Sequence, residues 1–274
     1  MPAKIYNAAP LPFMGQKRRF VPQFRKALQE FPFATTFVDL FGGSGLLSHI
    51  AKRERPDARV VYNDFDDFHL RVENIDRTNA IIDRIRTILA NAPRGKKVDP
   101  AKRQAILDLL ECHEQTGYVD YITVSSSILF SGKYATSLSE LERQTFYNTV
   151  KLSPYPLCTD YLDGLEIVKY DYRELFTRFK GVSNVAFLVD PPYLSTQAGH
   201  YSGYWKLADY LDVFQTIIKH PYIYFTSNKS SVIEFFDWMD AHGFGSPFNG
   251  AIRKKIENSV SYNAQYTDIM IYRP

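Results

Sequence analysis

The chain has 274 residues, a net charge of +3 and a hydrophobic content of 45%, values that are ordinary for a soluble globular protein. This length suits one large domain or a domain that carries an inserted subdomain. The two cysteines, Cys112 and Cys158, have no metal-ligand spacing and favour a reduced, cytoplasmic protein. We expect no signal peptide, and no apolar run is long enough to span a bilayer. Composition thus argues against secreted, membrane-spanning and disulfide-scaffold proteins.

The first part of the chain alternates between helix and strand. In chain order we expect a helix over 18–30, a strand over 35–41, a glycine turn over 42–45, a helix from 46, a strand over 58–62 and a helix over 66–90. The helices are predicted from apolar residues at helical spacing, and the strands from short apolar runs. A strand, a glycine turn and a helix in this order form the first half of a βαβ unit.

The character of the chain changes between residues 92 and 163. A helix is predicted over 99–116, and residues 119–163 form a mixed segment that is rich in Ser, Thr and Tyr and is interrupted by prolines. We therefore expect 92–163 to be an insertion. The flanking segments, 1–91 and 164–274, are then the two halves of one α/β core.

The α/β pattern resumes after the insertion. In chain order we expect strands over 166–170 and 185–189, a helix over 207–219, a strand over 222–226, a helix over 230–242 and a last strand over 268–272. Residues 185–189 are a continuous apolar run, which is typical of a parallel strand that is buried on both faces. The pattern predicts the α/β class, with a doubly wound and mostly parallel sheet that binds ligands at the carboxyl ends of its strands.

Residues with useful chemistry directly follow four of these strands. Asp64, Asp171 and Asp190 each come after a predicted strand, and the glycine turn 42–45 follows another. In a doubly wound sheet these four points meet in one crevice. Glycine lets the backbone approach a ligand closely, and a carboxylate after the second strand can accept hydrogen bonds from ribose hydroxyls. These features predict a cofactor that contains adenosine, and at this point NAD remains one of the candidates.

The segment Asp190-Pro191-Pro192-Tyr193 predicts more specific chemistry. Its prolines fix the backbone and remove two N–H donors, so this loop accepts hydrogen bonds and hardly donates them. A carboxylate beside backbone carbonyls suits a primary amine with two N–H donors. Tyr193 adds a flat face for a ring. Together these residues describe a pocket for a heteroaromatic base that carries an amino group.

Taken in order, these motifs resemble those of the Dam-like family of adenine-specific (N6) DNA methyltransferases. Asp190–Tyr193 is similar to the catalytic loop of that family, and Phe41, Gly43 and Gly45 match its F-x-G-x-G turn. The other positions that the resemblance assigns to the cofactor are Asp39 before the turn, Asp64 for the ribose, Asp171 and Tyr172 beside the adenine, and Phe13 and Lys17 in an N-terminal motif similar to W-x-G-G-K. Phe13, Gln16 and Leu40 depart from the family's common Trp, Gly and Pro.

The resemblance implies a Rossmann-like class I methyltransferase core with a mainly helical target-recognition subdomain at 92–163. It implies S-adenosylmethionine as the cofactor, no metal, and double-stranded DNA from which the target adenine is flipped out. In this interpretation Asp190 and the Pro191 carbonyl accept the two amino hydrogens, and Tyr193 stacks on the base. The implied partners are DNA and, as an option, a restriction endonuclease of the same system; no membrane partner is expected, and the protein is expected to be a monomer.

Further segments fit contacts with DNA. Residues 94–103 carry five basic side chains against one acidic, and Arg253, Lys254 and Lys255 form a second basic run. Both can contact phosphates, and both can equally be solvated surface. Tyr201, Tyr204 and Trp205 follow the catalytic loop, where they can close over a flipped base or pack as part of a surface loop.

Several alternatives remain from the residues alone. A cytosine-amino, RNA adenine or protein-amide methyltransferase uses the same hydrogen-bonding logic, and a non-catalytic DNA-binding protein can retain a degenerate methyltransferase fold. The Asp at position 190 favours adenine, because the resemblance associates Ser with cytosine. An NAD-dependent oxidoreductase explains Gly43, Gly45 and Asp64, but Ser48 stands where its third glycine belongs. Cys112-His113-Glu114 is a weak metal candidate on a predicted helix, so we expect no metal site.

Overall fold

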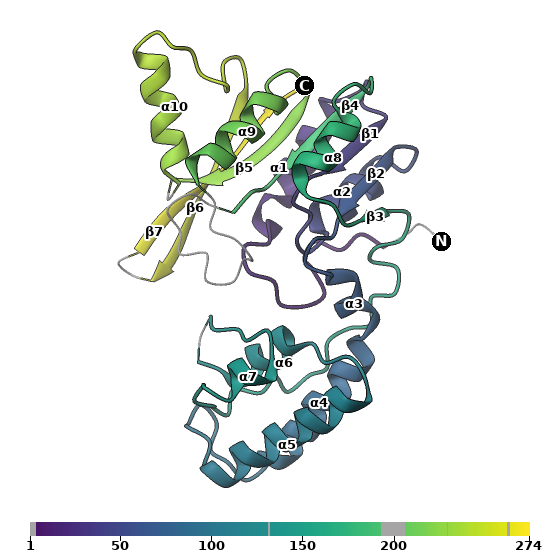
Figure 1. Ribbon diagram of the computed structural model, residues 1–274, viewed down its shortest axis with the longest axis vertical. Coiled ribbons are helices and arrows are strands. Elements are labelled where there is room, and N and C mark those ends of the chain that lie inside the picture. The colour runs from purple at the N-terminus through teal and green to yellow at the C-terminus, as the bar shows by residue number, and fades with distance from the viewer. Residues whose placement is uncertain (1–3, 131, 193–205, 229, 262–263) are drawn as a thin grey trace. The chain divides into compact units, whose positions relative to one another are not determined.

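The computed structural model describes residues 4–130, 132–192, 206–228, 230–261 and 264–274 (Figure 1). Its helices are η1 (Arg18–Phe20), α1 (Val21–Gln29), α2 (Leu46–Glu54), α3 (Phe68–Glu73), α4 (Ile75–Ile88), α5 (Pro100–Thr116), α6 (Tyr121–Ile128), α7 (Leu138–Leu141), α8 (Tyr172–Phe179), α9 (Leu207–Ile217) and α10 (Ser231–Ala241). Its strands are β1 (Thr36–Asp39), β2 (Arg59–Asn63), β3 (Glu166–Val168), β4 (Val185–Val189), β5 (Tyr222–Ser227), β6 (Ile252–Ser261) and β7 (Ala264–Arg273). The predicted elements are present with shifted ends, but the helix expected over 66–90 is broken at Asn74 into α3 and α4.

In the described part of the chain, seven strands form one sheet in the order β3-β2-β1-β4-β5-β7-β6 (Figure 1). Neighbours among β1 to β5 are parallel, whereas β7 is antiparallel to both β5 and β6. The order runs outward on both sides from β1 and β4, which confirms the predicted doubly wound, mostly parallel sheet of the α/β class. The sequence pattern does not predict the edge strand β6, because the basic run Arg253 to Lys255 interrupts its apolar alternation. Charged side chains of this kind are a common protection of an exposed sheet edge.

Two hydrophobic cores cover the two faces of this sheet. Successive residues of β4 alternate between them, as the pleat of a strand requires. Ala186 and Leu188 belong to the core that α1 and α2 complete, and Val185, Phe187 and Val189 belong to the core that α8, α9 and α10 complete. All five residues are buried, as the continuous apolar run predicts. The central strand β4 is therefore buried on both faces.

Helix α8 follows β3 at a place where the sequence pattern predicts no helix. The Asp171 carboxylate accepts a hydrogen bond from the Arg173 amide at 2.8 Å and caps the helix. Leu175, Phe176 and Phe179 are buried in the second core. An acidic N-cap followed by apolar residues at helical spacing is a recognisable helix start, so the signal was present but is short.

The chain divides into two compact units, and the second begins earlier than the expected insertion. The first unit consists of Met1–Ala9, Gly15–Asp66 and Leu162–Pro274, and the second of Pro10–Met14 and Asp67–Tyr161. This division differs from the expected start at residue 92, because helix α4 belongs to the second unit. Ile81, Ile82 and Ile85 of α4 are buried in one core with residues of α5 and α6. An amphipathic helix packs against the core that buries its apolar face. The sequence does not reveal against which of the two cores α4 packs.

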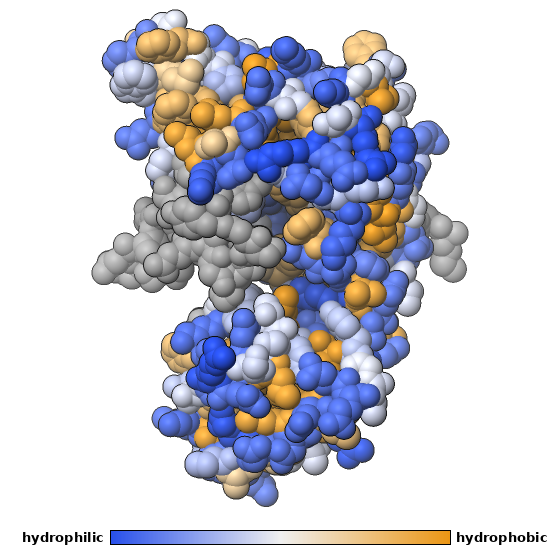
Figure 2. Space-filling model, viewed as in Figure 1, coloured by the Kyte–Doolittle hydropathy of each residue, from blue (hydrophilic) through white to orange (hydrophobic). Residues whose placement is uncertain are grey.

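The surface of the first unit carries a local apolar patch on a mainly hydrophilic background. Figure 2 shows hydrophobic residues gathered over α10 among hydrophilic neighbours. There the Trp238 and Phe244 side chains are 52% and 68% exposed, and their rings stack with centroids 5.8 Å apart. Part of the aromatic content thus lies outside the cores. Within the described residues, no helix combines the length and the apolar character that crossing a membrane requires.

Candidate active site

The carboxyl ends of β1 and β4 bring two of the predicted acidic residues together. Asp39 ends β1 and pairs in register with Leu188 of β4, and the Leu40 amide donates to the Leu188 carbonyl at 3.0 Å. Asp190 directly follows β4. The two carboxyl groups interact electrostatically, because the charge of Asp190 contributes to a raised pKa of Asp39. The central pair of strands therefore places both acids at one edge of the sheet.

Lys17 forms an ion pair with Asp190. Its ammonium Nζ lies 2.5 Å from Asp190 Oδ2 and also donates to the Gly15 carbonyl at 2.8 Å. The two side chains are only 7% and 18% exposed, so water screens the pair weakly. Burial raises the pKa of the Asp190 carboxyl, and the Lys17 charge opposes that rise. Lys17 therefore favours the ionised form of Asp190, although the two residues are 173 positions apart in the sequence.

Asp39 is fully buried and interacts electrostatically with both members of this ion pair. Its Oδ2 accepts a hydrogen bond from the Ser48 hydroxyl at 2.7 Å. Its Oδ1 accepts none of normal geometry from the described residues, although the Phe41 amide is close enough to lower the carboxyl's pKa. Burial dominates and raises the pKa of Asp39 to about 7. Asp39 thus holds a buried acceptor with unused capacity, and Ser48 orients it.

We expect the Asp39→Asn variant to be more stable than the natural protein near pH 8 and to lose that advantage toward pH 4. The folded pKa of Asp39 is about 7 and its ordinary value is 3.8, so the folded state binds more protons than the unfolded state between these values. The natural protein therefore loses stability as pH rises from about 4 to 7, and a neutral amide does not. Thermal unfolding across this pH range measures the difference. An advantage that is independent of pH contradicts the raised pKa.

The glycine turn after β1 is shaped by close packing against β2. The Gly45 amide donates to the Gly42 carbonyl at 2.8 Å, which closes the turn. Gly43 and Gly45 have φ angles of 50° and 70°, in the left-handed region that favours glycine. A Cβ on Gly42 would lie 2.3 Å from two ring carbons of Tyr62 and 2.8 Å from the Asn63 carbonyl oxygen. Gly42, which the F-x-G-x-G pattern leaves unspecified, is thus required for steric reasons.

Asp64 follows β2 and is 1% exposed. Its Oδ1 accepts a hydrogen bond from the Tyr62 hydroxyl at 3.0 Å, and its amide donates to the Val168 carbonyl of β3 at 2.8 Å. The carboxylate and the glycine turn both contact Tyr62, whose hydroxyl lies 2.8 Å from the Gly43 carbonyl. The structure therefore brings Asp64 and the turn together, as the doubly wound sheet predicts.

Asn63, which sequence reasoning missed, ties three strand ends to one another. Its side-chain Nδ2 donates to the Leu40 carbonyl after β1 and to the Tyr170 carbonyl after β3, each at 3.0 Å. Its Oδ1 accepts from the Tyr170 amide at 2.9 Å. One buried amide thus fixes the relative positions of the segments that lead to Phe41, Asp64 and Asp171. The available signal was a polar residue at the end of an otherwise apolar strand.

The two residues of the predicted pair after β3, Asp171 and Tyr172, have different roles. The Tyr172 ring contacts the Phe41 ring, with centroids 5.2 Å apart and planes inclined by 40°. Burial raises the pKa of Tyr172, and its hydroxyl lies 3.4 Å from the Asp209 carbonyl. Asp171 is exposed and caps α8. The aromatic rings of Phe41 and Tyr172 therefore form one wall, and Asp171 lies at its edge.

The predicted catalytic loop is described as far as Pro192. Pro191 is buried, and the Pro192 carbonyl accepts a hydrogen bond from the hydroxyl of Tyr210 on α9. Tyr210 is 1% exposed and was not identified from the sequence. Tyr210 anchors the loop through the Pro192 carbonyl, whereas Lys17 binds the Asp190 side chain. The predicted aromatic residues Tyr193, Tyr201, Tyr204 and Trp205 lie outside the described residues.

Phe13 falls in a different unit from the other predicted cofactor residues. Its ring packs edge to face on Phe68 within the second unit, with centroids 5.8 Å apart and planes at 84°. Lys17 belongs to the first unit. Phe13 thus has a packing role in the second unit, and its predicted contact with a cofactor stays a prediction.

Much of the predicted basic cluster stabilises the second unit itself. Arg94 donates to the Val150 carbonyl at 2.6 Å, and Arg103 to the Gln144 carbonyl at 3.2 Å, so both hold the segment that follows α7. Lys96 is exposed on the loop before α5, and so is its neighbour Lys97. These two lysines remain the candidates for phosphate contacts. In the other basic run, Arg253 pairs with Asp237 at 3.1 Å.

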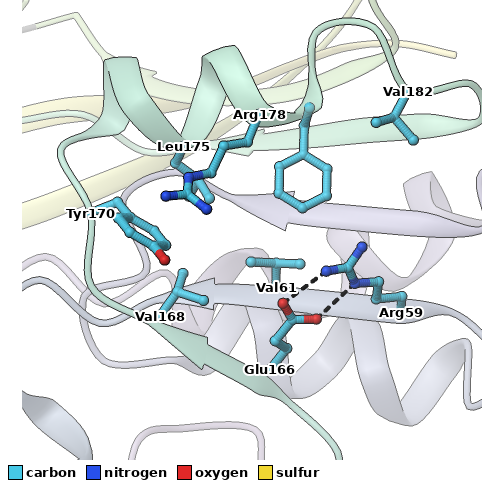
Figure 3. Close-up of a pocket in the computed structure, with 9 residues that line it drawn as sticks. Arg59, Val61, Glu166, Val168, Tyr170, Leu175, Arg178 and Val182 are labelled. Atoms are coloured by element: carbon cyan, nitrogen blue, oxygen red, sulfur yellow. Dashed lines mark hydrogen bonds and ion pairs between the residues drawn. The ribbon is translucent and has the colours of Figure 1, made fainter.

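A separate pocket lies on the outer part of the sheet, between β2, β3 and α8 (Figure 3). Val61 and Val168 form part of its lining, and at one end Glu166 bridges to Arg59 through two hydrogen bonds of 2.7 and 2.8 Å. Arg178 lies over the Tyr170 ring, 4.1 Å from its centroid, at the other end. None of the predicted site residues lines this pocket, so it is distinct from the edge where Asp39, Asp64 and Asp190 lie.

Comparison with known proteins gives a consistent assignment. The family model described as "D12 class N6 adenine-specific DNA methyltransferase" matches residues 13–219, more than half of the chain. A Haemophilus influenzae protein named "Putative methyltransferase" is 35% identical over 283 aligned positions, which cover 98% of this chain and 93% of that protein. Both findings agree with the family predicted from the ordered motifs and with its enzyme class. The chain therefore belongs to the family of D12 class N6 adenine-specific DNA methyltransferases.

Proposed function

We propose that this protein transfers a methyl group from S-adenosylmethionine to the N6 amino group of an adenine that is flipped out of double-stranded DNA. The Lys17–Asp190 ion pair carries the proposal, because it favours an ionised acceptor directly after β4. A carboxylate and an adjacent backbone carbonyl match the two N–H donors of an adenine amino group. The family description supports N6 of adenine as the methylated position.

The residues at the sheet edge fit a sulfonium cofactor. Asp39 and Asp268 both interact electrostatically with Asp190, so acidic groups gather around the Lys17–Asp190 ion pair. This excess of acidic groups suits a ligand with a positive charge at its reacting atom. The Oδ1 atom of Asp39 has unused capacity as an acceptor, and the glycine turn leaves room for close approach of a ligand.

The chain's own residues supply the orientation of the cofactor. Asp64 accepts hydrogen bonds from the ribose hydroxyls, in the position that a doubly wound fold gives such a carboxylate. Phe41 and Tyr172 offer flat apolar faces to the adenine ring, with Asp171 at the edge of that wall. The glycine turn, through Gly43 and Gly45, lets the backbone lie against the ligand.

The acceptors after β4 activate the amino group of the target base. When bound, the cofactor supplies an electrophilic methyl group on a sulfonium sulfur. The amino nitrogen is a poor nucleophile because its lone pair is delocalised into the ring. Asp190 and the Pro191 carbonyl would accept hydrogen bonds from its two N–H groups, which favours a tetrahedral nitrogen and directs the lone pair toward the methyl group. The new nitrogen–carbon bond would form as the carbon–sulfur bond breaks, and the methylated amine would then release one proton to water. The negative charge of Asp190 stabilises the positive charge that develops on nitrogen, and Tyr193 stacks on the extruded base.

The second unit is the proposed DNA-recognition unit. It takes the place in the chain that the family resemblance assigns to target recognition, although its main segment is Asp67–Tyr161 rather than 92–163. Lys96 and Lys97 are exposed there and contact phosphates in this proposal, which would weaken DNA binding as salt concentration rises. Restriction modification and a cytoplasmic location are consistent with this function.

The proposed reaction is tested by the identity of its product. The purified protein is incubated with labelled S-adenosylmethionine and with unmethylated double-stranded DNA, or with RNA of the same sequence. Nucleosides from each digest are then identified by mass spectrometry. We expect N6-methyladenine in the DNA alone. Methylcytosine or methylated RNA contradicts the proposed substrate, and loss of label from the cofactor without nucleic-acid methylation contradicts the proposed reaction.

We expect the Lys17→Ala variant to be most impaired at low pH. Burial already raises the pKa of Asp190, and removal of the Lys17 charge raises that pKa further. The carboxylate is the active form, so the ratio of variant to natural activity should rise with pH. Methylation rates between pH 6 and 9 measure this ratio, with Lys17→Arg expected to restore part of the low-pH activity and exposed Lys26→Ala as the control. If the ratio of variant to natural activity does not change with pH, Lys17 does not act by favouring the ionised form of Asp190.

A further inference from the structure

Tyr62 of β2 lies between the glycine turn and Asp64 and belongs to no motif identified in the sequence. The side chain is fully buried, and its hydroxyl lies 2.8 Å from the Gly43 carbonyl and 3.0 Å from Asp64 Oδ1. Its ring occupies the space beneath the turn, where a Cβ on Gly42 would lie 2.3 Å from two of its carbons. One side chain therefore contacts both elements that the proposed function assigns to the cofactor.

The hydroxyl of Tyr62 has two acceptors but one proton. The Asp64 carboxylate is the stronger acceptor, because hydrogen bonds to a charged group are shorter and stronger than those to a neutral carbonyl. Donation to Asp64 fixes the carboxylate rotamer, and donation to Gly43 fixes the peptide within the turn. A ligand hydroxyl that donates to the same Oδ1 atom of Asp64 competes with Tyr62 for that oxygen, and Tyr62 can then donate to the Gly43 carbonyl instead.

We propose that Tyr62 is a positioning residue of the cofactor site, whose hydroxyl couples the glycine turn to the ribose-binding carboxylate of Asp64. This inference rests on the proposed function, in which Asp64 binds ribose hydroxyls. Tyr62 touches no ligand in this scheme. It acts by holding Asp64 in the orientation that accepts from the ribose and by tightening the turn once the ribose is bound.

The test is calorimetric binding of S-adenosylhomocysteine and of its analogue that lacks both ribose hydroxyls, to the natural protein and to Tyr62→Phe. The variant keeps the buried ring and removes only the hydroxyl. We expect about tenfold weaker binding of S-adenosylhomocysteine, the scale of a lost hydrogen bond to a charged group, and little change for the analogue. The inference is overturned if Tyr62→Phe weakens the binding of both ligands equally, because a general structural defect would affect both. It is also overturned if the variant weakens the binding of neither ligand.

Tyr222→Phe is the matched control. Tyr222 is also fully buried, and its hydroxyl donates to the Pro247 carbonyl at 3.2 Å, away from the glycine turn. We expect it to bind both ligands as the natural protein does, while thermal unfolding shows a comparable small loss of stability in both variants. The double variant Tyr62→Phe/Asp64→Asn should lose less affinity than the sum of the single variants, since the two residues act as a unit. Additive losses overturn the coupling.

The controls also separate this inference from the proposed function. If the natural protein does not bind S-adenosylhomocysteine, both the cofactor assignment and the role of Tyr62 are wrong. If it binds the cofactor product and the dideoxy analogue equally well, Asp64 does not bind the ribose, and the role of Tyr62 fails while methyl transfer can stand. If the natural protein binds in a ribose-dependent way and Tyr62→Phe binds in the same way, only the inference about Tyr62 is overturned and the proposed function stands.

Discussion

Asp190→Asn is expected to reduce the rate of methyl transfer on the order of a thousandfold, the scale seen when one preorganised electrostatic group is removed from an active site. The amide retains the size of the side chain and loses its charge. It can no longer stabilise the positive charge that develops on the amino nitrogen, and its NH₂ group can point a donor at the donors of adenine. Single-turnover methylation of DNA under saturating cofactor measures this loss directly.

The same substitution has a structural consequence that must be separated from the chemical one. Lys17 is 7% exposed at its side chain and loses its counter-ion, and an unpaired buried charge is destabilising. Thermal unfolding and cofactor binding of the variant therefore accompany the rate measurement. The variant Lys17→Met/Asp190→Asn removes the unpaired ammonium and should regain stability without regaining activity. Exposed Asp212→Asn serves as the control. Near-natural activity in Asp190→Asn contradicts the role of the Asp190 carboxylate.

Gly42→Ala is expected to abolish cofactor binding at micromolar concentrations and to destabilise the fold by about 1–3 kcal/mol, the usual range for overpacking. The new Cβ would lie 2.3 Å from two Tyr62 ring carbons and 2.8 Å from the Asn63 carbonyl oxygen. The ring is fully buried and the oxygen belongs to the backbone, so neither can move away at low energetic cost. The turn must shift instead, and with it Gly43 and Gly45. Calorimetric binding of S-adenosylhomocysteine and chemical denaturation measure the two effects.

Gly181→Ala is the matched control for this prediction. A Cβ there meets no atom within 4 Å, and its φ lies outside the left-handed region. Alanine at such a position leaves the folded state unchanged and restricts the unfolded chain, so stability should be equal or slightly higher. Cofactor affinity should be natural. If Gly42→Ala behaves like Gly181→Ala, the turn is more compliant than its packing against Tyr62 indicates.

The candidate site shows which of its parts are local in sequence. Asp64 directly follows β2, and Phe41, Gly43 and Gly45 lie in the turn after β1, so the sheet topology alone predicts at which edge they lie. The partners that hold them are not local. Lys17 reaches Asp190 across 173 residues, and Asn63 bonds to Tyr170 across 107. Such contacts depend on which strands become neighbours, and apolar periodicity does not record that order.

The second unit shows a related limit. The helical character of α4 is clear from its apolar spacing, but buried isoleucines such as Ile81, Ile82 and Ile85 fit a helix packed against the sheet as well as one packed against α5 and α6. The expected boundary at 92 followed composition, which changes after the helix. The structure places the boundary at Asp67, where the chain turns from β2 into α3. The choice between the two cores is made by shape complementarity, which a single sequence does not display.

By itself the sequence determined the α/β class, the order of the motifs and the family. Buried parallel strands are recognisable as apolar runs, and ligand-binding loops are short segments that come soon after them. Only the tertiary structure decided that Lys17 pairs with Asp190, that Tyr62 joins the glycine turn to Asp64, and that Gly42 admits no side chain. The reason is physical. Strand identity is a local property of the chain, whereas hydrogen-bond partners, burial and steric exclusion arise from the juxtaposition of segments that are distant in sequence.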